Sequence, residues 1–253
     1  MILDPSTQNH FNQIANTWSQ KGWVNDAGFN STLAAFISDT EKKLRLDQKQ
    51  HKSLLYVGIG TGALFQWLQK YHIAGVDQAF TMLEQCPEGI IQINAPGNDL
   101  PFLMPNQFHL GLSRNLLKHC QDPYEVIREM YGKLRKGSSV ICFESVVFKK
   151  EDSAVPTELV RLTDPIHPPF LTIDQVVALY DHAGFRDIQY QIFLFRDTWL
   201  KKWIKAEQAD EEVQKDALSL YQRNQRYRKI YDVVLHDEDI TSTVPWIMLA
   251  ARK

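Results

Sequence analysis

The chain has 253 residues, of which 44% are hydrophobic and 23% charged, as is typical of a folded globular protein and not of a disordered one. A formal net charge of −2 at pH 7 argues against a nucleic-acid-binding protein, which usually carries a clustered basic face. Three widely spaced cysteines, the lack of a signal peptide and the lack of a long apolar run predict a cytoplasmic protein with reduced thiols, no metal site and no membrane span.

The N-terminal residues 1–50 have a largely helical pattern. Phe11, Ile14 and Trp18 recur at helical spacing, and so do Leu33 and Ile37. We therefore expect residues 1–50 to form a helical cap that precedes the main domain.

Strands and helices alternate over residues 51–196, the expected core. Such alternation predicts a mostly parallel sheet with helices on both faces. We expect an α/β, Rossmann-like sheet of seven strands, formed by residues 54–57, 73–76, 89–93, 108–112, 139–147, 188–195 and 244–250. The helices between them are expected at residues 63–71, 79–84, 123–134 and 172–182.

Two further segments are predicted to be insertions into this pattern. Residues 149–169 are polar and contain four prolines, which predicts an irregular segment. Residues 197–243 have a long helical pattern and are expected to form a helical lid. Residues 244–253 then return to the core as its last strand.

A glycine turn follows the first expected strand. Gly58, Gly60 and Gly62 come directly after the apolar run LLYV, and helical spacing resumes at once. A strand, a tight glycine turn and a helix start present backbone N–H groups to a polar ligand, with no side chain in the way. By itself the turn is weak evidence, because several classes of nucleotide-binding protein share it.

Asp77 makes the glycine turn more informative. It ends the second expected strand, where an acidic side chain can accept hydrogen bonds from ribose hydroxyls. The structural alternative is that Asp77 only caps the helix that follows. The glycine turn one strand earlier favours a ligand that contains a nucleoside.

Four stretches together resemble the class I S-adenosylmethionine-dependent methyltransferases: GIGTG, GVDQAFTML, NDLPF, and the segment from FHLGLSRNLL to KGSSVI. The resemblance is closest to a small-molecule group that includes quinone C-methyltransferases. It covers residues 50–148 strongly, and residues 172–195 and 244–253 more weakly. It implies the methyl donor S-adenosylmethionine and a small-molecule acceptor.

The resemblance also implies roles for particular residues. The three glycines would lie against the methionine and ribose parts of the donor, and Asp77 would hold the ribose hydroxyls. Adenine would lie beside Gln78, Met82, Asn94 and Ala95. The methyl-bearing end would lie near Trp18 and near Ser113, with Arg114 and Asn115.

Three residues depart from the family pattern. Tyr56 stands where an Asp or Glu is usual in the first strand, Asn94 replaces an Asp, and His109 replaces another. These departures motivate an alternative: a relative that binds the cofactor but transfers no methyl group. A nucleic-acid methyltransferase is disfavoured, because SRNLL stands where such enzymes carry an aromatic-proline tetrad.

Candidate acceptor-site residues are few. His119 follows the fourth expected strand, where it either bonds a loop backbone or acts on the acceptor. His10, His167 and Trp199 are weaker candidates from the cap, the proline-rich segment and the lid. Many aromatic residues in the cap and lid favour an apolar or planar acceptor, although most of them are expected to pack helices onto the sheet. The sequence is compatible with a homodimer.

Overall fold

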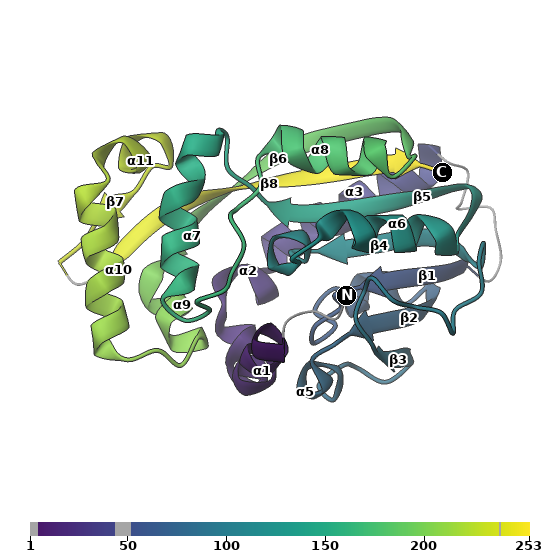
Figure 1. Cartoon of the computed structure of the whole chain (residues 1–253), viewed down its shortest axis with the longest axis horizontal. Helices are drawn as coiled ribbons and strands as arrows, with labels where there is room; N and C mark the ends of the chain where they lie inside the picture. Colours follow the sequence, from purple (N-terminus) through teal and green to yellow (C-terminus); the bar gives the residue numbers. More distant parts are fainter. Residues whose placement is uncertain (1–4, 44–51, 238) are drawn as a thin grey trace.

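A computed structural model of the chain describes residues 5–43, 52–237 and 239–253. Seven strands follow one path in the order β3-β2-β1-β4-β5-β8-β6, with β8 antiparallel to both neighbours and the pairings from β3 to β5 parallel (Figure 1). This confirms the expected Rossmann-like sheet. The strands are β1 (Lys52–Val57), β2 (Tyr71–Asp77), β3 (Ile90–Asn94), β4 (Phe108–Arg114), β5 (Leu134–Ser145), β6 (Arg186–Trp199) and β8 (Ile240–Arg252).

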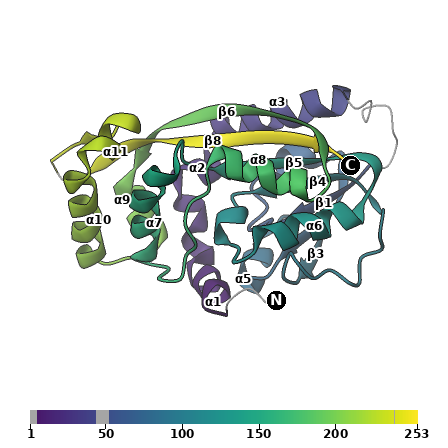
Figure 2. The ribbon, with the colours of Figure 1, turned by 45° about the horizontal axis from the view of Figure 1, so that its top comes forward.

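Alternating side chains in the central strands fill two cores. In β1, Leu55 and Val57 pack on one face, and Leu54 and Tyr56 pack on the other. Helices α6 (Pro123–Lys133) and α8 (Ile173–His182) cover the first face, and α3 (Ala27–Lys43) covers the second (Figure 2). Tyr56 is only 2% exposed, so the residue that replaces the family acid is part of the α3-side core.

Two short helices follow the first two strands. They are α4 (Phe65–Leu68) and α5 (Phe80–Leu83). The expectation of a helix continuing to residue 71 was wrong, because Tyr71 already belongs to β2, where it pairs with Lys52. The Tyr71 hydroxyl donates to the buried Glu41 carboxylate at the end of α3, an interaction that helical periodicity cannot reveal.

The sequence predicted an irregular segment after β5 because of its prolines, but the structure shows that part of this segment is helical. It forms a short turn of helix, η4 (Lys150–Ser153), and then α7 (Ala154–Arg161). Pro156 lies in the first turn of α7, where a missing N–H costs no intrahelical hydrogen bond. Val155 anchors α7 in an apolar cluster with α9 and α10.

Strands β6 and β8 run beyond the parallel strands and carry a separate group of helices. This group contains α9 (Leu200–Ala206), α10 (Glu211–Arg223) and α11 (Gln225–Ile230), and α7 packs against it (Figure 1, left). A short strand, β7 (Val234–Leu235), pairs with the extended part of β8. The expected helical stretch is therefore three helices and a strand, and β6 and β8 are both longer than expected.

The N-terminal elements pack beside the ends of the parallel strands. They are α1 (Pro5–Ile14), η1 (Ala15–Gln20) and α2 (Gly22–Asn25). Asn12 holds Thr81 of α5 through hydrogen bonds to its N–H and hydroxyl groups, and Gln8 donates to the Gln78 carbonyl. Residues 1–4 and 44–50 of the expected cap lie outside the described residues. Among the described helices, none has the length and apolarity required to cross a membrane.

Candidate functional site

The glycine turn lies at the carboxyl end of β1, between β2 and β4. Gly58 and Ile59 both donate their N–H groups to the Val76 carbonyl, at 2.8 and 3.1 Å, which folds the turn back onto β2. Gly60 has a φ of +57°, and a side chain there would meet only the Trp18 indole nitrogen, at 3.8 Å. Since ligands bind beyond the carboxyl ends of parallel strands in open α/β sheets, this edge is the place to look for a site.

Both oxygens of the Asp77 carboxylate accept backbone hydrogen bonds. Oδ2 accepts from the Gly60 N–H at 2.8 Å, and Oδ1 accepts from the Ala79 N–H at 2.9 Å. The contact to Ala79 holds the residue just before α5, which is close to the structural alternative for Asp77 in the sequence analysis. The contact to Gly60 holds the glycine turn in place. Burial raises the Asp77 pKa, and these N–H groups partly oppose that shift. Each oxygen keeps a further lone pair, so Asp77 can also accept from ligand hydroxyls.

A cavity of about 70 Å³ lies over this turn. We call it the glycine-loop cavity. Of the residues predicted to bind the donor, it brings together Trp18, Gly58, Gly60, Asp77, Gln78 and Met82. Further lining comes from Thr7, Phe11, Val57, Val76, Gly97, Arg114, Asn115, Leu116, His119 and Cys120. Its volume is below the roughly 300–1,000 Å³ of typical ligand pockets. A nucleoside ligand therefore requires its cover of α1 and η1 to move outward.

Four predicted residues do not line this cavity. Gly62 turns the chain past Pro87, and a Cβ there would lie 2.9 Å from the proline ring. Asn94 donates to the carbonyls of Asp77 and Gln78, and so supports the loop from outside. Ala95 is buried behind the same loop, and Ser113 is fully buried, with its hydroxyl 3.5 Å from that of Tyr180.

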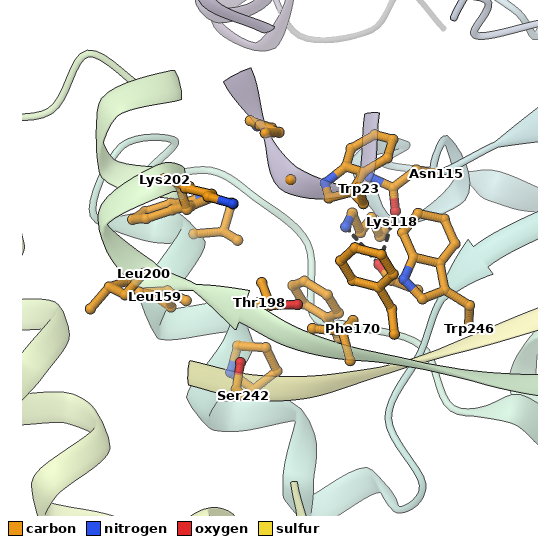
Figure 3. Close-up of a pocket in the computed structure, with 18 of the residues that line it drawn as sticks. Trp23, Asn115, Lys118, Leu159, Phe170, Thr198, Leu200, Lys202, Ser242 and Trp246 are labelled. Carbon is orange, nitrogen blue, oxygen red and sulfur yellow. Dashed lines mark hydrogen bonds between the residues drawn. The ribbon is translucent and has the colours of Figure 1, made fainter. Parts of the chain in front are cut away.

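A second, larger pocket of about 430 Å³ lies between the sheet edge, the N-terminal elements and the helices carried by β6 and β8. We call it the aromatic pocket. Figure 3 shows Trp23, Phe170 and Trp246 gathered near Lys118 at one end, with Leu159, Leu200 and Lys202 at the other. Its other aromatic side chains are Phe11, Phe195, Trp199, Trp203, Tyr221 and Tyr227. The sequence had predicted Trp199 and His10 as residues of the acceptor site, and both line this pocket. It had not predicted Lys118, which also lines the pocket.

Polar groups line the inner end of the aromatic pocket. The Lys118 ammonium donates to the Ser145 hydroxyl at 2.7 Å, and that hydroxyl donates to Asn115 Oδ1 at 2.9 Å. Asn115 has a φ of +54°, a left-handed conformation that Asn tolerates better than most residues. Burial lowers the Lys118 pKa to about 8 and raises that of the nearby Glu144 to about 7, although each charge favours the other. The pair therefore places an exchangeable proton close to the pocket.

Three residues line both cavities: Phe11, Asn115 and His119. The Phe11 and His119 rings meet edge to face, with centroids 5.0 Å apart. Neither His119 ring nitrogen has a hydrogen-bond partner among the described residues, so the alternative of a backbone-bonded histidine is wrong. Burial, together with the nearby His167 and Lys118, holds the His119 pKa well below its usual value. The imidazole is therefore neutral at pH 7.

The other two predicted histidines have different surroundings. His10 lines the aromatic pocket and lies 3.1 Å from the Glu207 carboxylate, which also pairs with Lys21 at 2.5 Å. Burial raises the Glu207 pKa, but these partners outweigh it and bring the pKa to about 2. His167 is fully buried, does not line either cavity, and packs against His119 with ring centroids 4.9 Å apart.

The fold agrees with comparisons to known proteins. The YcgJ protein of Bacillus subtilis is 18% identical, with a TM-score of 0.71 over 81% of this chain and 93% of that one. A candidate methyltransferase of Bacillus halodurans is 16% identical, with a TM-score of 0.71 over 84% of this chain and 97% of that one. These identities show a shared fold alone.

A third structure was solved with a bound thioether nucleoside. Phosphoethanolamine N-methyltransferase 2 of Haemonchus contortus, in complex with phosphomonomethylethanolamine and S-adenosylhomocysteine, is 18% identical, with a TM-score of 0.57. The match covers 81% of this chain and 49% of that one. A search of curated protein sequences found no match.

A family model supplies the assignment that the structures alone do not. The model described as "Methyltransferase domain" matches residues 55–142, which run from β1 into β5 and include the glycine turn, Asp77 and His119. All the residues that the sequence predicted to bind the donor fall within this match, except Trp18, which lies in the N-terminal segment. Residues 55–142 therefore form a class I S-adenosylmethionine-dependent methyltransferase domain, and the protein is an S-adenosylmethionine-dependent methyltransferase.

Proposed function

We propose that the protein methylates a small, apolar or planar molecule held in the aromatic pocket. The observation that carries the proposal is the shared wall of Phe11, Asn115 and His119, which brings the two cavities within reach of one another. S-adenosylmethionine bound in the glycine-loop cavity supplies an activated methyl group. The lack of a side chain at Gly60 and the free lone pairs of Asp77 fit such a nucleoside.

In this proposal each group of residues has a separate task. Asp77, Gln78 and Met82 hold the nucleoside, and Trp18 covers it from η1. Phe11 and Asn115 orient the acceptor toward the donor, since methyl transfer needs an in-line approach at roughly 3–3.5 Å. The acceptor's lone pair forms the new bond to the methyl carbon as the carbon–sulfur bond breaks. If the attacking atom carries a proton, the neutral His119 imidazole can accept it.

The cap and the lid serve the acceptor side in the same proposal. The described parts of residues 1–50 and 197–243 contribute half of the residues that line the aromatic pocket, and in this proposal they exclude water from the transfer. Its aromatic lining fits a planar ring, as the resemblance to quinone C-methyltransferases suggests, and the enclosure disfavours a macromolecular acceptor.

The test is a screen for methylated products. The purified full chain is incubated with S-adenosylmethionine and panels of phenols, quinols, aromatic acids and aromatic amines, and products are followed by mass. We expect one panel to give products 14 Da heavier than the acceptor, together with stoichiometric S-adenosylhomocysteine. An Asp77→Asn variant is the background control. Transfer to nucleic acid or protein but to none of the small molecules would contradict the proposal.

A further inference from the structure

Arg114 is a buried cation without a carboxylate partner. It ends β4 and is only 6% exposed. One guanidinium nitrogen, Nη2, donates to the Trp23 carbonyl at 2.7 Å and to Asn30 Oδ1 at 2.8 Å. The guanidinium group also lies over the Trp23 ring, 5.0 Å from its centroid. All these partners are neutral, and none of the ion pairs among the described residues includes Arg114.

The residue that carries this unpaired charge also lines a cavity. Arg114 lines the glycine-loop cavity together with Gly58 and Gly60, and its Nε–H has no hydrogen-bond partner among the described residues. Burying an unpaired charge costs several kcal/mol, and burying an unpaired N–H group adds to that cost. A protein recovers this cost when an anionic group binds there. The position therefore fits an anion that arrives with the ligand.

The neighbouring strand strengthens this assignment. In the family pattern that this sequence resembles, an Asp or Glu stands at the position of Tyr56 and helps to hold the amino-acid end of the donor. Burial raises the Tyr56 pKa to about 12, so its hydroxyl is neutral at pH 7. Tyr56 and Arg114 lie on paired strands, because Tyr56 of β1 is aligned with Leu112 of β4, two residues before Arg114. The nearby Arg114 cation is therefore left without the carboxylate that the family pattern has in this strand.

We propose that Arg114 forms an anion subsite that binds the α-carboxylate of the donor's methionine moiety. The carboxylate is the only anionic group of S-adenosylmethionine, and a guanidinium N–H gives it a short, charge-assisted hydrogen bond. The inference rests on the proposed use of the glycine-loop cavity for the donor. It adds that this protein recognises the donor through its carboxylate and makes little use of its ammonium group.

The test compares three ligands by calorimetry on the full chain: S-adenosylhomocysteine, its decarboxylated analogue, which keeps the amine, and methylthioadenosine, which has neither group. We expect the wild type to bind S-adenosylhomocysteine at least about tenfold more tightly than the decarboxylated analogue. Arg114→Met should lose that preference and keep its affinity for methylthioadenosine. Arg114→Lys should keep part of the preference for S-adenosylhomocysteine over the decarboxylated analogue, because the positive charge remains but the planar guanidinium group is lost.

The controls separate this inference from the donor assignment. Arg135→Met removes an exposed charge at the start of β5, at the opposite end of the strand from the site, and should leave all three affinities unchanged. Asp77→Asn should weaken all three ligands alike. Equal wild-type affinity for S-adenosylhomocysteine and its decarboxylated analogue would overturn the Arg114 subsite while the donor assignment stands, and this comparison needs no variant. If the wild type bound none of the three ligands, both proposals would be overturned.

Discussion

His119 is the residue at which the two cavities meet. Its ring packs between Phe11 and His167, and both of its nitrogens are without partners among the described residues. A buried histidine usually has a hydrogen-bond partner, because an unpaired polar group costs about 1–3 kcal/mol. The protein bears this cost at the point where proton acceptance from an acceptor would be needed, which is typical of functional sites.

We expect His119→Asn to lower kcat by about a hundredfold for an acceptor that loses a proton, since general base catalysis contributes at least that much. The Kd for S-adenosylhomocysteine should stay within about threefold of wild type. Single-turnover rates and calorimetry on the same preparation measure the two quantities. His182→Asn, an exposed substitution in the last turn of α8, is the matched control. An unchanged kcat with such an acceptor would remove His119 from the chemistry.

At the scale of elements, one buried ion cluster joins the N-terminal segment to the helices on the opposite side of the aromatic pocket. Glu207 follows α9 and pairs with Lys21, which follows η1, and with His10 of α1. Thr17 of η1 adds a hydrogen bond to the Ala206 carbonyl at 2.7 Å. These contacts fasten together the two segments proposed to enclose the acceptor.

We expect Glu207→Gln to destabilise the fold by about 3 kcal/mol, because removing one partner leaves the Lys21 charge buried and unpaired. Urea unfolding at pH 7 measures the loss. Glu88→Gln, at an exposed turn position, should change stability by less than about 0.5 kcal/mol. A loss as small as that of the control would show that the cluster contributes little to the fold.

The sequence predicted the elements that depend on local pattern. The apolar run of β1, the glycine turn after it and the helix α8 each carry their signal within a few residues, and each forms close to where it was expected. The pairing of Lys21 with Glu207 could not be predicted, because it joins residues far apart in the chain. The resemblance placed Arg114 near the donor, but its contacts with Trp23 and Asn30 could not be predicted, because they too join distant parts of the chain.

Helix α7 and the long ends of β6 and β8 were missed for a related reason. They are stabilised by a small apolar cluster of their own, which includes Val155, Leu200, Leu220 and Ile240. That cluster exists only once these distant segments meet. By contrast, the four prolines of residues 149–169 gave a local signal for an irregular segment. That prediction was wrong for residues 154–161, which form α7.

At the scale of the whole molecule, several buried groups resist protonation in the folded state. Burial lowers the pKa of His167 to about 3 and holds that of His119 well below its usual 6.5. Because a depressed pKa means that the unfolded chain binds the proton more readily, the stability from these groups is present above pH 6.5 and is lost as pH falls. The depressed Glu207 pKa, about 2, adds a further loss below pH 4.5.

We therefore expect the free energy of unfolding to fall between pH 7.5 and pH 5 by up to about 2 kcal/mol for each buried imidazole. Urea titrations at the two pH values measure it. A variant with both His119→Asn and His167→Asn should show a flatter pH dependence, and His182→Asn should keep the wild-type slope. An identical slope in the double variant would assign the acid sensitivity to other groups.

Strands β6 and β8 extend beyond the parallel strands, and this extension separates the proposed binding site for the methyl donor from much of the proposed binding site for the acceptor (Figure 1). The proposed donor site lies at the ends of β1, β2 and β4. Much of the wall of the proposed acceptor site lies on an arm formed by β6 and β8, two strands that join the sheet only at its antiparallel side. Substitutions in the arm that leave its contacts with the N-terminal segment in place can accumulate without disturbing the proposed donor site. Acceptor choice in this architecture is therefore free to diverge quickly while the methyl donor stays the same.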